Sequence, residues 1–168
     1  MLELGRAGSA GTRGEVPVLR DGEVVATLRA SNWRESATAV VGDREWVFAK
    51  ARGVLTSRRS VDTEDAVRSS ARQASFWKGT WVVELDGKHI DVERTSMWKT
   101  THRYLDRGRL VAESGTTGSW SPRPSLTADD RLPLDQQVFL LWLEVVINRR
   151  SQAAVSAATG AAVIGGSS

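Results

Sequence analysis

The stretch that decides the fold is residues 138–147, which reads VFLLWLEVVI and is apolar at nine of its ten positions. Glu144 is the exception. A helix that is apolar on every side must be buried on every side. The chain before this stretch reads as short β-strands joined by tight turns. We therefore predict a mainly β fold, a closed antiparallel barrel of about twelve strands that encloses one hydrophobic C-terminal helix.

The expected helix begins at Pro133, because the N–H group that proline lacks is unpaired in a first turn anyway. Arg149 and Arg150 mark its expected end, where positive charge suits the helix dipole. A helix of about 17 residues is about 25 Å long, and a strand of seven residues covers about 23 Å. The helix and the barrel wall therefore match in length.

Turn signals divide the preceding chain into strands. Each of these signals contains Gly and Asp, which tolerate the positive φ angles of tight hairpins; they are Asp21-Gly22, Gly42-Asp43, Asp86-Gly87 and Asp106-Arg107-Gly108. Residues 53–58 and 66–74 supply two further expected strands. Trp120 is expected to end one more before Pro122 and Pro124 interrupt the pattern.

Turn length predicts which residues face each other across three of these hairpins. The predicted pairs are Trp81 with Val92, Val83 with Ile90, Ala39 with Trp46, Ala37 with Phe48, Tyr104 with Leu110, and His102 with Ala112. In the hairpin at Asp86-Gly87, this register places the large apolar side chains on one face and most polar ones on the other.

Composition predicts one domain, residues 15–150. Residues 1–14 are rich in Gly, Ala and Ser and are expected to be a disordered N-terminal segment, and residues 151–168 a flexible tail. The 168 residues include no cysteine, which excludes disulfides and thiolate chemistry, and the formal net charge is +3. The apolar stretch is too short to span a bilayer, which takes about 20 residues. We therefore expect a cytoplasmic protein without a transmembrane span.

Known catalytic and cofactor motifs are missing from the sequence. The chain has no nucleophile elbow, phosphate loop or dinucleotide fingerprint, and its two histidines, His89 and His102, fall on different predicted strands. We therefore predict no catalytic residue, no metal site and no cofactor. Glu144 is either a buried acid with a raised pKa, or a carboxylate that reaches the barrel rim or pairs with an arginine; we favour the second interpretation.

The run LPLDQQVFLLWLEVVINRR, which follows a β meander with spaced tryptophans, resembles the tubby C-terminal-like superfamily. That group includes tubby-like proteins, LURP-one-related proteins and phospholipid scramblases. The resemblance covers residues 15–150 and implies a closed twelve-stranded barrel threaded by a hydrophobic helix. Tubby domains bind phosphoinositides through surface basic residues, and scramblases carry a calcium-binding segment. Neither set of residues can be matched here position by position.

The expected function is a non-enzymatic binding module that recognises anionic phospholipid peripherally at a membrane surface. Residues 44–109 contain 14 Lys and Arg against 9 Asp and Glu, and positive charge attracts anionic surfaces. Arg58 and Arg59, beside a polar loop, are the candidate lipid-binding residues. A protein partner is the other expectation, whereas nucleic acid is not favoured, because several tryptophans are predicted to lie in the core. The alternatives are a barrel with an internal small-molecule site or an unrecognised enzyme activity. The sequence does not indicate an oligomeric state.

Overall fold

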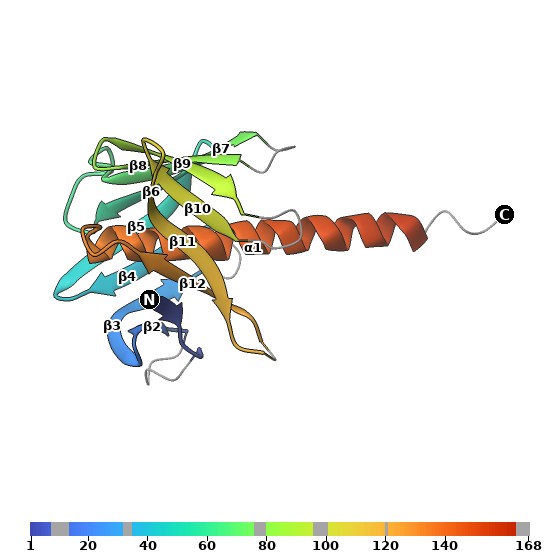
Figure 1. Ribbon diagram of the computed structural model, residues 1–168, viewed down its shortest axis with the longest axis horizontal. Coiled ribbons are helices and arrows are strands. Elements are labelled where there is room, and N and C mark those ends of the chain that lie inside the picture. Colours follow the sequence, from blue (N-terminus) through green and yellow to red (C-terminus); the bar gives the residue numbers. More distant parts are fainter. Residues whose placement is uncertain (8–13, 32–34, 76–79, 96–100, 120, 164–168) are drawn as a thin grey trace.

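A computed structural model describes residues 1–7, 14–31, 35–75, 80–95, 101–119 and 121–163, with side chains as far as residue 157. Its strands form one closed antiparallel barrel around the first part of the single helix α1 (Figure 1), which confirms the predicted fold. The twelve strands are β1 (Leu2–Leu4), β2 (Val16–Arg20), β3 (Glu23–Ala30), β4 (Ala37–Val41), β5 (Arg44–Ala51), β6 (Val54–Arg59), β7 (Ser69–Ser75), β8 (Thr80–Leu85), β9 (Lys88–Arg94), β10 (His102–Asp106), β11 (Arg109–Thr117) and β12 (Arg123–Ala128).

The short strand β1 closes the barrel. The other strands pair in chain order, and β1 lies between β2 and β12, with Leu2 opposite both Arg20 and Leu126. Leu2 is only 1% exposed. The prediction that residues 1–14 are disordered is therefore wrong for Leu2–Leu4, because pairing on both sides orders this segment and covers two strand edges that would otherwise be open. Residues 8–13 lie outside the described part of the chain.

The predicted interruption by proline is also wrong. Pro124 lies inside β12, opposite Thr116 of β11. A proline is tolerated near the start of a strand, where the loss of one backbone donor removes little pairing. Leu126 further along β12 is fully buried. Trp120, the expected end of an extra strand, lies outside the described residues.

The hairpin registers follow the turn chemistry. Asp86 and Gly87 have φ angles of 45° and 78°, as a two-residue type I′ turn requires. Four of the predicted facing pairs are confirmed, namely Trp81 with Val92, Val83 with Ile90, Ala39 with Trp46, and Ala37 with Phe48. These residues are all buried in the barrel interior.

The register of the β10–β11 hairpin differs from the prediction. The turn consists of Arg107 and Gly108, with φ angles of 51° and 80°, and it leaves Asp106 opposite Arg109. A register shift after Tyr104 then places that residue opposite Ala112, not Leu110. The prediction failed because Arg107 takes the left-handed conformation that sequence rules assign to Gly, Asn or Asp, and because a bulge leaves no strong local signal.

The helix α1 (Leu134–Val163) fills the barrel and then leaves it. Its residues 138–143 are at most 1% exposed. Trp142 packs on both Phe48 and Phe139, with ring centroids 5.1 and 5.8 Å apart. A helix about 10 Å across, with side chains, fits the central space of so wide a barrel. The apolar stretch therefore forms the core, as predicted.

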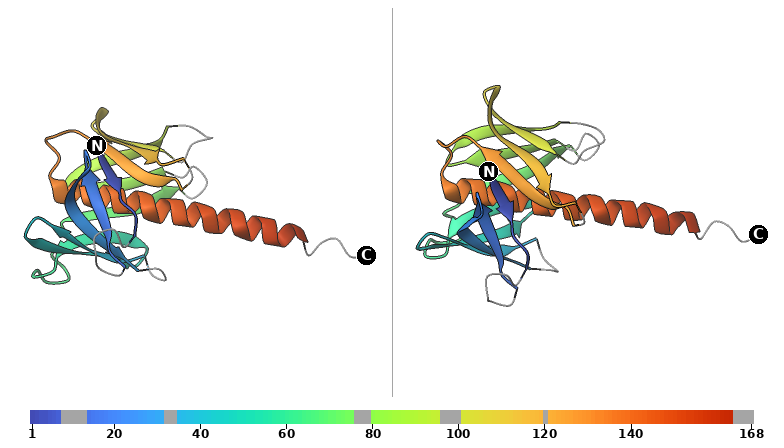
Figure 2. Two further views of the ribbon diagram at one scale, coloured as in Figure 1. Left: turned by 90° about the horizontal axis from the view of Figure 1, so that it is seen from below. Right: turned by 60° about the horizontal axis from the view of Figure 1, so that its bottom comes forward.

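The predicted end of the helix at residue 150 is wrong. The helix continues to Val163 and projects from the barrel (Figure 2), with residues 152–157 exposed. Alanine has the highest helix propensity, and residues 151–159 contain neither Gly nor Pro, so nothing local stops the helix at Arg150. Residues 164–168 lie outside the described part of the chain. The described residues of α1 contain no stretch that is both long and apolar enough to be a membrane span.

Candidate functional site

Arg58 and Arg59, the two candidate residues, lie on opposite faces of the barrel wall. Arg59 pairs in register with Trp46, whose side chain is buried, whereas Arg58 pairs with Val47. The Arg58 guanidinium donates hydrogen bonds to the backbone carbonyls of Asp62 at 3.0 Å and Arg59 at 3.3 Å. Arg58 therefore holds its own loop, and the two arginines do not form one surface patch, because successive strand residues alternate faces.

Arg59 instead joins two other arginines at the mouth of the barrel where α1 begins. A cavity of about 180 Å³, which we call the basic pocket, is lined by Arg44, Trp46, Arg59, Arg68, Asp86, Pro133 and Asp135. These residues come from β5, β6, the loop before β7, the β8–β9 turn and the start of α1. Arg44 Nε lies 3.8 Å from Asp43 Oδ1, and Arg68 Nε lies 3.7 Å from Asp62 Oδ2. Neither of these ion pairs is close.

The start of α1 adds partial positive charge to the basic pocket. Gln137 N–H donates the first helical hydrogen bond to the Pro133 carbonyl at 3.0 Å, so proline occupies the position where a capping side chain normally accepts from the first-turn amides. Proline has no such acceptor. The Nε1 of Trp46 is also buried without a hydrogen-bond partner among the described residues. In the first turn, the Asp135 side chain accepts from its own backbone N–H, so Trp46 Nε1 is the lining donor that is shown to lack an acceptor within the described part of the chain.

Two carboxylates balance part of this positive charge. Asp86 accepts a hydrogen bond from Gln136 Nε2 at 2.6 Å. Burial raises the pKa of Asp135 above its usual value of 3.8, and the charge of Asp86 raises it further, while Arg44 and Arg68 lower it. Three guanidinium groups and two carboxylates line the pocket, and Asp43 and Asp62 lie 3.8 and 3.7 Å from two of those guanidinium groups. Because neither ion pair is close, the guanidinium groups keep donors for an anion at the helix N-terminus.

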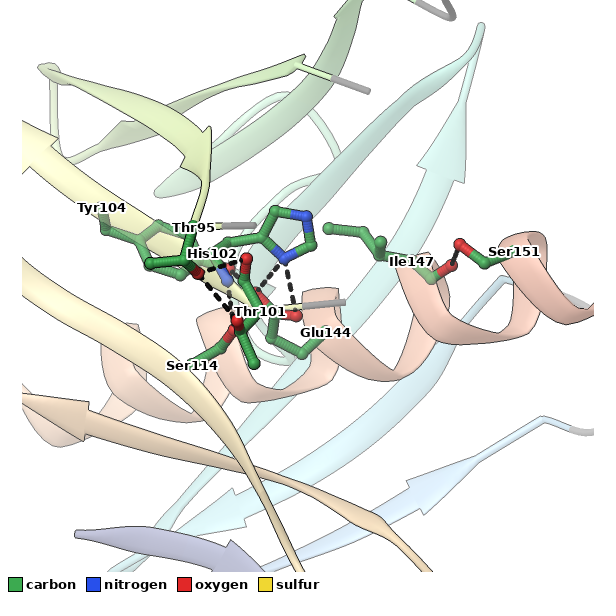
Figure 3. Close-up of polar contacts among 8 residues, drawn as sticks. All are labelled: Thr95, Thr101, His102, Tyr104, Ser114, Glu144, Ile147 and Ser151. Atoms are coloured by element: carbon green, nitrogen blue, oxygen red, sulfur yellow. Dashed lines mark hydrogen bonds and ion pairs between the residues drawn. The ribbon is translucent and has the colours of Figure 1, made fainter. Parts of the chain in front are cut away.

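A second group of polar side chains lies deep inside the barrel, where Glu144 of α1 meets β10 (Figure 3). The Tyr104 hydroxyl donates to Glu144 Oε1 at 2.5 Å, and His102 Nδ1 lies 3.0 Å from Glu144 Oε2. The backbone N–H of His102 donates to Ser114 Oγ at 2.7 Å. Glu144 is 1% exposed and His102 is 3% exposed. We call Glu144, Tyr104, His102 and Ser114 the buried cluster.

The buried cluster corrects the favoured interpretation of Glu144. This carboxylate neither reaches the rim nor pairs with an arginine, because its partners are a tyrosine and a histidine. Burial, followed by the negative charge of Glu144, raises the pKa of Tyr104 well above 10, so its hydroxyl stays a neutral donor. With its members almost fully enclosed, the cluster fixes the depth and rotation of α1 inside the barrel and offers a ligand little access.

The residues of these two sites are visible in the sequence, but the sequence does not show that they come together in the fold. Glu144 was the lone charged residue in an apolar stretch, and His102 was assigned to a predicted strand. The basic pocket gave no local signal, because Arg44, Arg59 and Arg68 belong to different segments. Within the described residues, no group of three or more His, Asp or Glu side chains is placed to hold a metal ion. Comparisons with protein-family models, curated proteins and solved structures found no match.

Proposed function

We propose that this protein is a non-enzymatic binding module that recognises the phosphate group of an anionic phospholipid in the basic pocket. The observation that carries the proposal is the meeting of Arg44, Arg59 and Arg68 with the first turn of α1 around one open cavity. Arginine guanidinium groups and the backbone N–H groups of helix N-termini are well suited to bind phosphate oxygens. The suggested membership of the tubby-like superfamily agrees with such a ligand and stays a prediction.

The position of the pocket favours a ligand that approaches from outside. It lies at the mouth of the barrel, next to the β4–β5 turn, which precedes Arg44 at the start of β5, and the β8–β9 turn, which contains Asp86. The alternative of an internal small-molecule site is less favoured, because residues 138–143 of α1 occupy the interior. Of the two arginines nominated from the sequence, the proposal keeps Arg59 and drops Arg58, whose guanidinium is bound to backbone carbonyls.

Co-sedimentation with lipid vesicles tests the proposal. We expect the protein to pellet with phosphatidylcholine vesicles that contain phosphatidic acid, and to pellet less at physiological than at low salt, because salt screens exposed charges. Each basic side chain near an anionic surface contributes about 1 kcal/mol. The triple variant Arg44→Ala/Arg59→Ala/Arg68→Ala should therefore weaken binding on the order of 100-fold.

A matched triple variant controls for the loss of net charge. Arg52, Arg94 and Arg103 are exposed and lie towards the opposite end of the barrel. Their replacement by alanine removes the same charge and should change vesicle binding much less. Equal losses in the two variants would assign the binding to general electrostatics and reject the pocket. If the wild-type protein fails to pellet even at low salt, the lipid proposal is wrong and a protein partner becomes the better hypothesis.

A further inference from the structure

A larger pocket adjoins the basic pocket at the same mouth. It has a volume of about 320 Å³, and Asp86 and Pro133 line both cavities. We call the apolar side chains of its lining, Leu85, Ile90, Val111 and Leu132, its floor. The rest of the lining is Pro133 and the polar residues Asp86, Lys88, Asp106, Arg109, Asp129, Arg131 and Gln136. In the floor, Leu85 and Ile90 are almost fully buried, whereas Val111 and Leu132 are partly exposed. An open apolar floor beside an anion site is suited to a ligand with a charged end and an apolar end.

Several polar groups around the larger pocket are already paired with each other. Arg109 donates to Asp129 Oδ2 at 2.5 Å, and the backbone N–H of Arg131 donates to Asp129 Oδ1 at 3.0 Å. The hydrogen bond from the Arg131 amide, and to a lesser extent Arg109, holds the pKa of Asp129 below its usual value. Asp129 therefore stays a carboxylate. Asp86 is satisfied by Gln136. The apolar surface that a ligand would cover here belongs to Val111 and Leu132, which are partly exposed.

We propose that the two pockets together hold one glycerophospholipid molecule, with its phosphate and glycerol at the basic pocket and its first chain methylenes on the floor of the larger pocket. This inference rests on the proposed function. The larger pocket is near the lower limit of about 300 Å³ for ligand sites, so it holds a short segment and not two complete acyl chains. The rest of each chain stays in the membrane.

Two soluble probes separate the headgroup from the chain. Glycerol 3-phosphate carries only the phosphate and glycerol, and monomeric dihexanoyl phosphatidic acid adds short acyl chains. Burial of a methylene group favours binding roughly fourfold, so calorimetric titration should give the short-chain lipid at least a tenfold tighter dissociation constant. Equal affinity for the two probes would overturn the chain site.

Variants of the floor provide the second readout. Leu132→Trp fills the larger pocket and Val111→Ser removes apolar surface from it, while both leave the arginines in place. In either variant we expect the advantage of the short-chain lipid to fall at least fivefold with glycerol 3-phosphate binding unchanged. A parallel loss for both probes would reject the division into two subsites.

The triple arginine variant separates the two proposals. It should abolish binding of both probes, because both carry the phosphate. If neither probe binds the wild-type protein, the proposed function fails and this inference fails with it. If glycerol 3-phosphate binds through the arginines but the acyl chains add nothing, the proposed function stands and only the chain site is rejected.

Discussion

At the scale of single residues, the buried cluster is the least expected feature. A carboxylate inside an apolar helix costs several kcal/mol unless hydrogen bonds compensate. Glu144 has two such partners on β10, the Tyr104 hydroxyl and the His102 ring. Glu144 is the only charged residue among residues 138–147, so these bonds favour one rotation of the otherwise apolar stretch inside the barrel. The cluster therefore specifies the position of α1 as well as stabilising it.

The variant Tyr104→Phe tests this role. It removes the donor at 2.5 Å from Glu144 Oε1 and leaves a buried acceptor with one partner fewer. We expect the free energy of unfolding, measured by urea titration, to fall by about 1–3 kcal/mol. In a double-mutant cycle with Glu144→Gln, the coupling energy should exceed about 0.5 kcal/mol. Additive effects would show that the tyrosine acts by packing only.

At the scale of elements, α1 is held where it leaves the barrel. Arg150 donates to both carboxylate oxygens of Glu35, at 2.5 and 2.7 Å, and lies 5.0 Å from the centre of a Trp81 ring. Lys50 Nζ lies 2.7 Å from the same carboxylate. These contacts join the helix to the β3–β4 loop, β5 and β8. Arg150 thus secures the middle of a long helix and does not mark its C-terminal end.

The Glu35 contacts predict a dependence of stability on pH. The Arg150 hydrogen bonds, with help from Lys50, lower the pKa of Glu35 from 4.5 to about 2. A lowered folded-state pKa means that the stabilisation is present above pH 4.5 and is lost as the pH falls towards 2. Glu35→Gln should therefore reduce the free energy of unfolding by about 1–2 kcal/mol at pH 7.

The difference between wild type and Glu35→Gln should shrink to a small remainder in thermal unfolding near pH 2, where about half of the Glu35 carboxyl groups of the folded protein are protonated. Glu93→Gln, which changes an exposed carboxyl group on β9, serves as the control and should differ little from wild type at either pH. A Glu35→Gln effect of equal size at both pH values would show that lost packing, and not lost charge, is responsible.

Much of the barrel wall could be predicted from the sequence, because each hairpin is specified by its own turn residues and by the alternation of its two strands. The Asp86-Gly87 turn sets the register, and the alternation on each side of it shows that Trp81, Val83, Ile90 and Val92 all face inward. By contrast, β1 is three residues long, and it is held by pairing with β2 and with the distant β12 and by the burial of Leu2. The site could not be predicted for the same reason, because Arg44 and Arg68 approach Asp135 only when the barrel has closed.

At the scale of the whole molecule, closure depends on three residues. The strand β1 completes the hydrogen bonding of both β2 and β12, and Leu2 lies 1% exposed against the core. Without β1, both neighbouring strands would present open edges, which favour pairing with other chains. Both the closure of the barrel and its resistance to aggregation therefore depend on β1.

Leu2→Ala is the corresponding prediction. Truncation of a buried leucine should reduce the free energy of unfolding by about 2–5 kcal/mol and lower the thermal midpoint. Glu3→Ala, one position along on the opposite face of β1, should stay within about 0.5 kcal/mol of wild type. Size-exclusion chromatography should show more aggregate for Leu2→Ala only. Equal stability of the two variants would mean that β1 contributes little to closure.

The pairing of β1 with β12 also has a consequence for how the protein is made. The residues Leu2 and Leu126 face each other, but the ribosome releases the first long before the second. At 5–20 residues per second, the interval is roughly 6–25 s. During that time, the β1 edge that pairs with β12 is uncovered, and the interior still lacks α1. The barrel therefore cannot close until β12 and α1 have been synthesised, and the earlier strands are exposed to pairing with other chains until then.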